Sequence, residues 1–226
     1  MKSYLNRAAL TALALALVAN VTPAAAQFSG LKAMKSVGAP SSGGDIDGFL
    51  ATTQRAEALT RVSAISLLQA VSSREEADRL RSTMAAAEAQ SDPKEREIAL
   101  RRVASDAAAQ LAAIDYDAKS KELERTATTE QRKQMAVAVY NLALGIMLDK
   151  SAVEQGHALT QSAMGNPMGM ATQGAKLLRV KDAASSISGQ MGNLAKILTG
   201  LPKLMSVAKL TALPTSTADL PKSAVD

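Results

Sequence analysis

Apolar side chains recur at spacings of three and four residues along most of the chain, which is the spacing of one face of an α-helix. The first such run begins beside Asp45 and Asp47, two helix N-cap candidates. Its apolar stripe consists of Ile46, Phe49, Leu50, Ala56, Leu59, Val62 and Leu68. No stretch shows the strict alternation of a half-buried strand. The pattern therefore predicts an all-α protein.

Capping residues and helix breakers divide this pattern into separate helices. Ser73 and Glu76 have the spacing of a capping box, so a helix, or a continuation of the first one, begins there. Asp92 and Pro93 are typical of an N-cap followed by the first helical residue. Adjacent threonines at 126–129 favour a further break. After the helix that begins near residue 45, these signals predict helices over about 73–90, 93–125, 130–164 and 167–210.

The helices are expected to form one domain over residues 45–212, an elongated helical bundle of four or five helices. Ala104, Ala107 and Leu111 belong to a narrow, Ala-rich seam that favours long antiparallel, coiled-coil-like hairpins. Residues 27–44 are rich in Gly, Ser and Pro and predict a flexible leader. Residues 213–226 contain two prolines and several Ser and Thr, which predicts a disordered tail, so both termini are expected to be disordered.

The first 26 residues have the three-part layout of a cleaved signal peptide. Lys2 and Arg7 form a positive region, and an apolar run of roughly 14 residues follows from Ala8 to Val21. Small residues then lead to a cleavage site near Ala26. The sequence therefore predicts an exported protein, periplasmic or secreted, of a bacterium.

Composition removes most kinds of catalytic site. The 226 residues include no Cys and a single His, His157, which argues against thiol chemistry, disulfides and His-based zinc centres. There is no Gly-x-Ser-x-Gly elbow, and no Gly-rich phosphate loop follows a strand. Aromatic residues make up 2%, so few rings are available to stack on bases. We therefore predict no enzyme activity, no cofactor and no nucleic-acid partner.

One helical segment, 135–148, is apolar on every face except at Asn141. A helix of this kind is either the central helix of a core or an element that enters a membrane or a partner. At about 14 residues it is too short to span a bilayer alone. In the core interpretation, which we prefer, Asn141 requires a hydrogen-bond partner inside the bundle.

The segment 194–210 predicts a cationic amphipathic helix. From 167 to 213 there are six cations and one anion. Such a helix suits an anionic membrane surface or a groove on a partner, and it is equally typical of the outer helix of a bundle. The candidate membrane- or partner-binding residues are Leu194, Ile197, Leu198, Leu201, Leu204 and Met205, with Lys196 and Lys203.

Two further clusters have simpler explanations than a site. Met164, Met168 and Met170 are a candidate Cu(I) set, because thioethers are soft ligands, but no Cys or neighbouring His supports it. Flexible Met side chains that fill an irregular gap explain the same group, so we predict no metal site. Asp115 and Asp117, with the charged residues that follow, fit a solvated helix face.

These patterns together favour a non-enzymatic structural or protein-interaction component of the bacterial cell envelope. It would act by presenting helical faces to an envelope protein or to a second copy of itself. The alternative is a membrane-surface or apolar-ligand-binding helical protein that uses 194–210 and 135–148.

Overall fold

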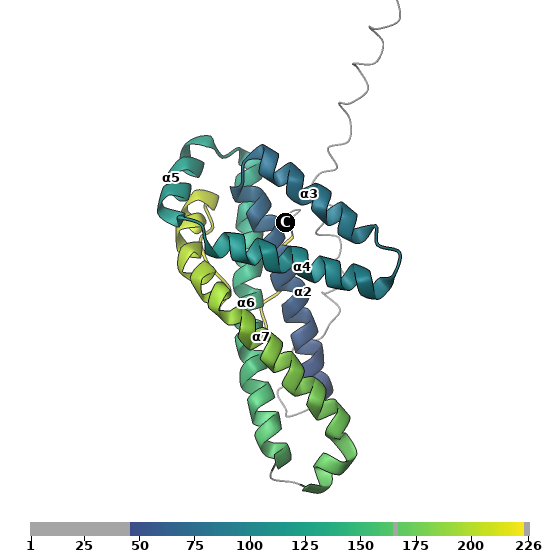
Figure 1. Ribbon diagram of the computed structural model, residues 1–226. Helices are drawn as coiled ribbons and strands as arrows, with labels where there is room; N and C mark the ends of the chain where they lie inside the picture. The colour runs from purple at the N-terminus through teal and green to yellow at the C-terminus, as the bar shows by residue number, and fades with distance from the viewer. Residues whose placement is uncertain (1–45, 165–166, 224–226) are drawn as a thin grey trace, which may run out of the picture.

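The computed structural model describes residues 46–164 and 167–223, and these residues form an all-α protein without strands. Figure 1 shows the long helices side by side, with α4 crossing them. The helices are α2 (Ile46–Val71), α3 (Arg74–Glu88), α4 (Pro93–Ala112), α5 (Tyr116–Thr126), α6 (Thr129–Met164) and α7 (Pro167–Ala208). The signal peptide and leader predicted over 1–44 lie outside the described residues and stay predictions.

Two helix starts are those that the capping signals predict. The Ser73 hydroxyl accepts from the backbone N–H of Glu76, and the Glu76 carboxylate accepts from the Ser73 N–H at 2.9 Å. The Asp92 carboxylate accepts from the N–H groups of Lys94 and Glu95, with Pro93 as the first helical residue. These side chains satisfy backbone donors that a helix start leaves unpaired.

The described residues hold six helices, where four or five were predicted. The additional break lies at Ala113–Asp115, inside a stretch that the sequence predicts as one helix. The Asp115 carboxylate caps α5 by accepting from the N–H groups of Asp117 and Ala118. Tyr116 is then buried, and its hydroxyl donates to the Leu111 carbonyl at 2.9 Å. Burial raises the pKa of Tyr116 to about 12, so the phenol keeps its proton.

Helix α6 is the centre of the core. Most of its segment 135–148 is buried, and Met135, Leu142, Leu144 and Leu148 are wholly enclosed. Each buried side chain of this size contributes roughly 1.5–3 kcal/mol of transfer free energy. The core interpretation of this segment is therefore confirmed.

Two glycines allow unusually close helix contacts. A Cβ at Gly145 on α6 would lie 2.5 Å from the Thr60 hydroxyl oxygen and 3.0 Å from the Thr60 nitrogen on α2. A Cβ at Gly200 on α7 would overlap the ring of Tyr116. Any larger side chain at either position would force the helices apart.

One arginine holds the ends of two helices. The Arg132 guanidinium donates to the carbonyls of Glu124 and Val207, each at 2.8 Å, and to that of Ala127 at 3.2 Å. These carbonyls lie at or next to the C-terminal ends of α5 and α7, where acceptors lack helical partners and a cation is favoured.

The C-terminal segment corrects the prediction of a disordered tail beginning at 213. Residues 213–223 lie against the bundle, with Pro214 and Pro221 buried. The Asn141 side-chain amide donates to the Lys222 carbonyl at 2.9 Å, and its oxygen accepts from the Lys222 N–H at 2.8 Å. The Lys222 ammonium lies 4.4 Å from the centre of the Tyr140 ring. The partner that Asn141 requires is therefore the backbone of Lys222.

Candidate functional site

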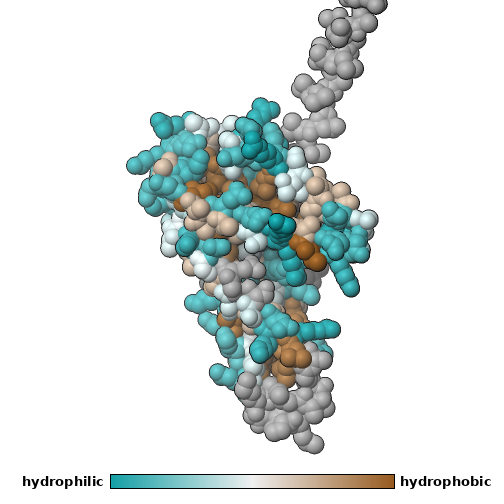
Figure 2. Space-filling view, viewed as in Figure 1, coloured by the Kyte–Doolittle hydropathy of each residue, from teal (hydrophilic) through white to brown (hydrophobic). Residues whose placement is uncertain are grey.

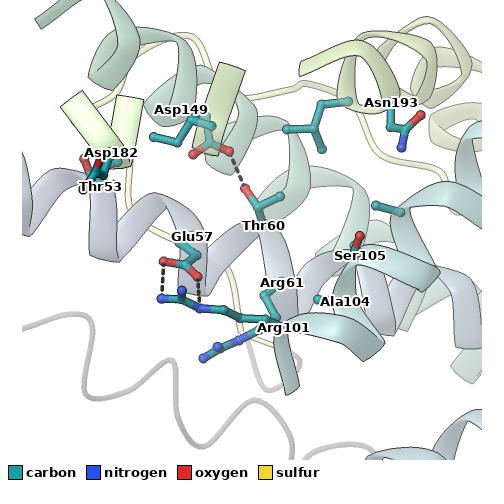
Figure 3. Close-up of a pocket in the computed structure, with 15 residues that line it drawn as sticks. Thr53, Glu57, Thr60, Arg61, Arg101, Ala104, Ser105, Asp149, Asp182 and Asn193 are labelled. Atoms are coloured by element: carbon teal, nitrogen blue, oxygen red, sulfur yellow. Dashed lines mark hydrogen bonds and ion pairs between the residues drawn. The ribbon is translucent and has the colours of Figure 1, made fainter. Parts of the chain in front are cut away.

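A cavity of about 460 Å³ lies among α2, α4, α6 and α7, a volume within the usual range of small-molecule sites. Its apolar part is formed by Ala64, Ala104, Ala108, Ala183, Ile187 and Leu194. Its polar part, shown in Figure 3, is formed by Thr53, Glu57, Thr60, Arg61, Arg101, Ser105, Asp149, Asp182 and Asn193. The lining thus combines a small apolar surface with several charges.

Helical spacing brings these side chains to one place. The α2 residues Thr53, Glu57 and Thr60 follow one another at intervals of four and three, so they share a face. On α4, Arg101 and Ser105 are four residues apart and face the same space. Asp149 comes from α6, one turn after Gly145, which lies directly against Thr60 of α2.

Asp149 is the most unusual residue of this lining, because its carboxyl group is almost fully enclosed. The residue is 4% exposed, and one carboxylate oxygen accepts from the Thr60 hydroxyl at 3.0 Å. Burial raises the pKa of Asp149 to about 6, against the lowering effect of the Thr60 hydrogen bond, and the charge of Glu57 raises the pKa further. At neutral pH this carboxyl group is therefore a buried negative charge.

The two arginines of the lining are already paired with carboxylates. Arg61 lies 3.0 Å from Glu97, and Arg101 lies 2.8 Å from Glu57. Figure 3 shows the contact of Arg101 with Glu57. Among the ion pairs of residues 46–164 and 167–223, none includes Asp149 or Asp182. The charge left unbalanced in the cavity is therefore negative.

The lining offers charged and hydrogen-bonding groups that can bind a ligand. It contains a carboxyl group with a hydroxyl donor, and none of its residues is a His or a Lys. His157 is exposed on α6 and does not line the cavity. Within the described residues, no group of three or more His, Asp or Glu side chains is placed to hold a metal ion.

The candidate binding residues of 194–210 lie mostly inside the molecule. Leu194, Ile197, Leu201 and Leu204 are 2% exposed or less, and Met205 is half-buried. Leu198 is exposed, and so are Lys196 and Lys203, the latter paired with Asp117 on α5. This apolar face packs in the core, so only its Leu198 edge and its lysines meet solvent.

The methionine group spans the end of α6 and the start of α7. Met164 is the last residue of α6, and Met168 and Met170 lie in the first turn of α7. Their side chains lie outside the described part of the chain, so the structure does not test the Cu(I) alternative.

One helix in the described residues, Thr129–Ser162, is long and apolar enough to cross a membrane. In its most apolar window, 67% of the residues are buried within the protein. The core helix of a soluble protein has these properties too.

The sequence interpretation missed Asp149 and Thr60. A signal for Asp149 exists, because the Asp directly follows the apolar run Ile146–Leu148 and interrupts the helix face that this run predicts to be buried. Thr60 carries no such signal, since its role depends on the close approach at Gly145.

Comparison of the chain with protein-family models, with curated proteins and with solved structures finds no match in any of the three. The functional argument therefore rests on this chain's own residues and geometry.

Proposed function

We propose that this protein is an exported, non-enzymatic component of the bacterial cell envelope that presents a helical surface to a partner protein or to a second copy of itself. In this proposal the bundle is elongated, with coiled-coil-like antiparallel hairpins and a disordered leader. The presenting surface is the helical arm formed by α3 and the first half of α4, residues 74–102.

The observation that carries the proposal is how few residues of this arm are fully buried. Its buried residues are Ala77 and Ala87, whereas the buried residues of α4, Val103, Ala107 and Leu111, all lie in the second half of that helix. Figure 1 shows the connection between α3 and α4 at the edge of the molecule, away from α6 and α7. The tip of the arm, residues 88–95, is therefore exposed to solvent, whereas Leu80, Met84 and Leu100 pack partly against the core.

The arm is nevertheless held in a fixed direction. Its two helices begin with complete N-caps at Ser73 and Asp92, each of which stabilises a helix by about 1 kcal/mol. Ion pairs of α4 with α2, Arg61–Glu97 and Arg101–Glu57, attach its base to the bundle. A preorganised arm loses little conformational entropy when it binds.

The surface of the arm has the mixed character of a transient interface. Ile98 is 61% exposed, and its neighbours along the chain include charged residues of both signs. Figure 2 shows that much of the visible surface of the protein is hydrophilic. An exposed apolar residue within a polar rim is typical of the centre of a protein–protein contact.

A photo-crosslinking residue at position 98 tests this proposal in the producing bacterium. The matched control is position 178 on α7, because Leu178 is 62% exposed but lies far along the chain from the arm. We expect a defined adduct, with an envelope protein or with a second copy, from position 98 and not from position 178. Identical adducts from both positions, or none from position 98, would contradict the proposal.

The alternative function is binding to a membrane surface or to an apolar ligand through 194–210 and 135–148. It would require α7 to leave the bundle, because Leu194, Ile197 and Leu201 are buried. Flotation with anionic vesicles separates the two: under our proposal the protein stays in the dense fraction. Co-flotation that is lost with Lys196→Glu and Lys203→Glu would favour the alternative.

A further inference from the structure

We propose that the cavity among α2, α4, α6 and α7 binds a small organic cation, a primary alkylamine or polyamine, whose ammonium group is received by Asp149. This site is separate from the arm of residues 74–102, and the inference does not depend on the function proposed for that arm.

The sign of the ligand follows from the charges of the lining. Arg61 and Arg101 are each paired with a glutamate, so their charges are already balanced. Asp149 and Asp182 belong to no ion pair among the described residues. An anionic ligand would have to displace glutamates from the arginines, whereas a cation meets carboxylates that are free to receive it.

The enclosed position of Asp149 makes it the anchor. The residue is 4% exposed, and its hydrogen bond with Thr60 occupies one carboxylate oxygen. A buried carboxylate without a cation is costly, and the effect is visible in its pKa, which burial raises to about 6. An ammonium group would supply the missing charge and a hydrogen-bond donor together.

The rest of the lining selects the kind of cation. Aromatic residues, which bind quaternary ammonium groups through their ring faces, are not among the residues that line the cavity. Alanines with Ile187 and Leu194 offer a short apolar surface that suits a methylene chain. Asp182, which is exposed, lies on the lining where a second ammonium of a polyamine could be received.

Calorimetric titration of the purified chain with octylamine, octanol and octanoate tests the proposal, because these probes share one chain and differ in the charge of the head group. Octylamine is expected to bind saturably and more tightly than the other two. Asp149→Asn should weaken octylamine binding about tenfold or more, which is the usual effect of losing a charge-assisted contact. The matched control is Asp106→Asn, an exposed carboxylate on α4 outside the lining, which should bind as the wild type does.

Spermidine extends the test to the second carboxylate. Asp182→Asn changes an exposed side chain and should fold normally, so this measurement is available even if Asp149→Asn folds poorly, and unchanged spermidine binding by Asp182→Asn would contradict the role of Asp182. The variant should weaken spermidine binding and leave octylamine binding unchanged. Wild-type affinity for octylamine in a folded Asp149→Asn variant, octanoate binding as tight as that of octylamine, or no saturable binding of either amine would each overturn the proposal.

Discussion

The contact between Gly200 and Tyr116 predicts opposite effects for the same substitution at two positions of α7. Glycine in a helix interior costs about 0.8–1.0 kcal/mol relative to alanine. At Gly192 a Cβ would meet nothing within 4 Å, so Gly192→Ala should stabilise the protein by nearly this amount. At Gly200 the Cβ would lie within 3.0 Å of three atoms of the Tyr116 ring, a separation that real Cβ atoms do not adopt.

The magnitude at Gly200 follows from what must move. Tyr116 is 8% exposed, and its hydroxyl donates to Leu111, so the ring has neither free space nor freedom to turn. Overpacking of a filled site costs about 1–3 kcal/mol, and loss of the hydroxyl hydrogen bond adds about 1 kcal/mol. After the gain in helix propensity is subtracted, Gly200→Ala should destabilise the protein by about 1–3 kcal/mol.

Urea unfolding followed by far-UV circular dichroism measures both variants against the wild type. A third variant, Tyr116→Ala, identifies the contact. The double variant Gly200→Ala, Tyr116→Ala should be about 2–4 kcal/mol more stable than the sum of the two single changes, because the added methyl group then meets an empty space and the gain in helix propensity is recovered. Stabilisation by Gly200→Ala equal to that by Gly192→Ala would refute the reasoning.

Three further predictions concern the buried polar groups and the end of α7. The pKa of Asp149 is about 6 in the folded protein against 3.8 ordinarily, so ionisation of this carboxyl group lowers the free energy of unfolding. The loss grows from pH 4 to pH 6 and levels off at about 3 kcal/mol above pH 6. The unfolding free energy of Asp149→Asn relative to that of the wild type should therefore rise by about 3 kcal/mol between pH 4 and pH 7, as measured by urea unfolding of both proteins. A difference that does not change with pH would contradict this. Lys209 has a φ of 54° and closes α7, with the Leu210 N–H donating to the Met205 carbonyl at 3.0 Å. Lys209→Gly should raise the unfolding free energy by about 0.5–1 kcal/mol where Lys209→Ala does not, since only glycine adopts this conformation without cost. Asn141→Leu should remove the hydrogen-exchange protection of the Lys222 amide and cost about 1–3 kcal/mol, and retained protection would show that the C-terminal segment is held by other contacts.

The parts of the fold that were predictable depend on neighbouring residues. The caps at Ser73 and Asp92 act over two or three residues, so their spacing alone places two helix starts. The apolar run 135–148 was predicted to be the core helix because a surface helix would show a polar face.

The parts that were missed depend on contacts between distant residues. The break at Asp115 interrupts an Ala-rich periodicity that continues across it, and beyond the break the Tyr116 ring packs on α7 at Gly200, a contact between residues 84 positions apart. The composition of 213–223 is that of a disordered tail, yet the segment is held by Asn141, 81 residues earlier. The cavity has the same origin, since Asp149 and Thr60 are 89 residues apart and meet only in the folded bundle.

The hydrogen bonds between Asn141 and Lys222 also have a consequence for the order in which the bundle can be stabilised during synthesis. Asn141 is synthesised before Lys222, so any bundle that forms without residue 222 would bury an amide whose partner is missing. An unpaired buried amide is costly, so this contact can stabilise the central helix only after Lys222 has been synthesised. A chain that stops before residue 222 lacks this pair, so we expect its bundle to open more readily to a protease than that of a chain that includes Lys222.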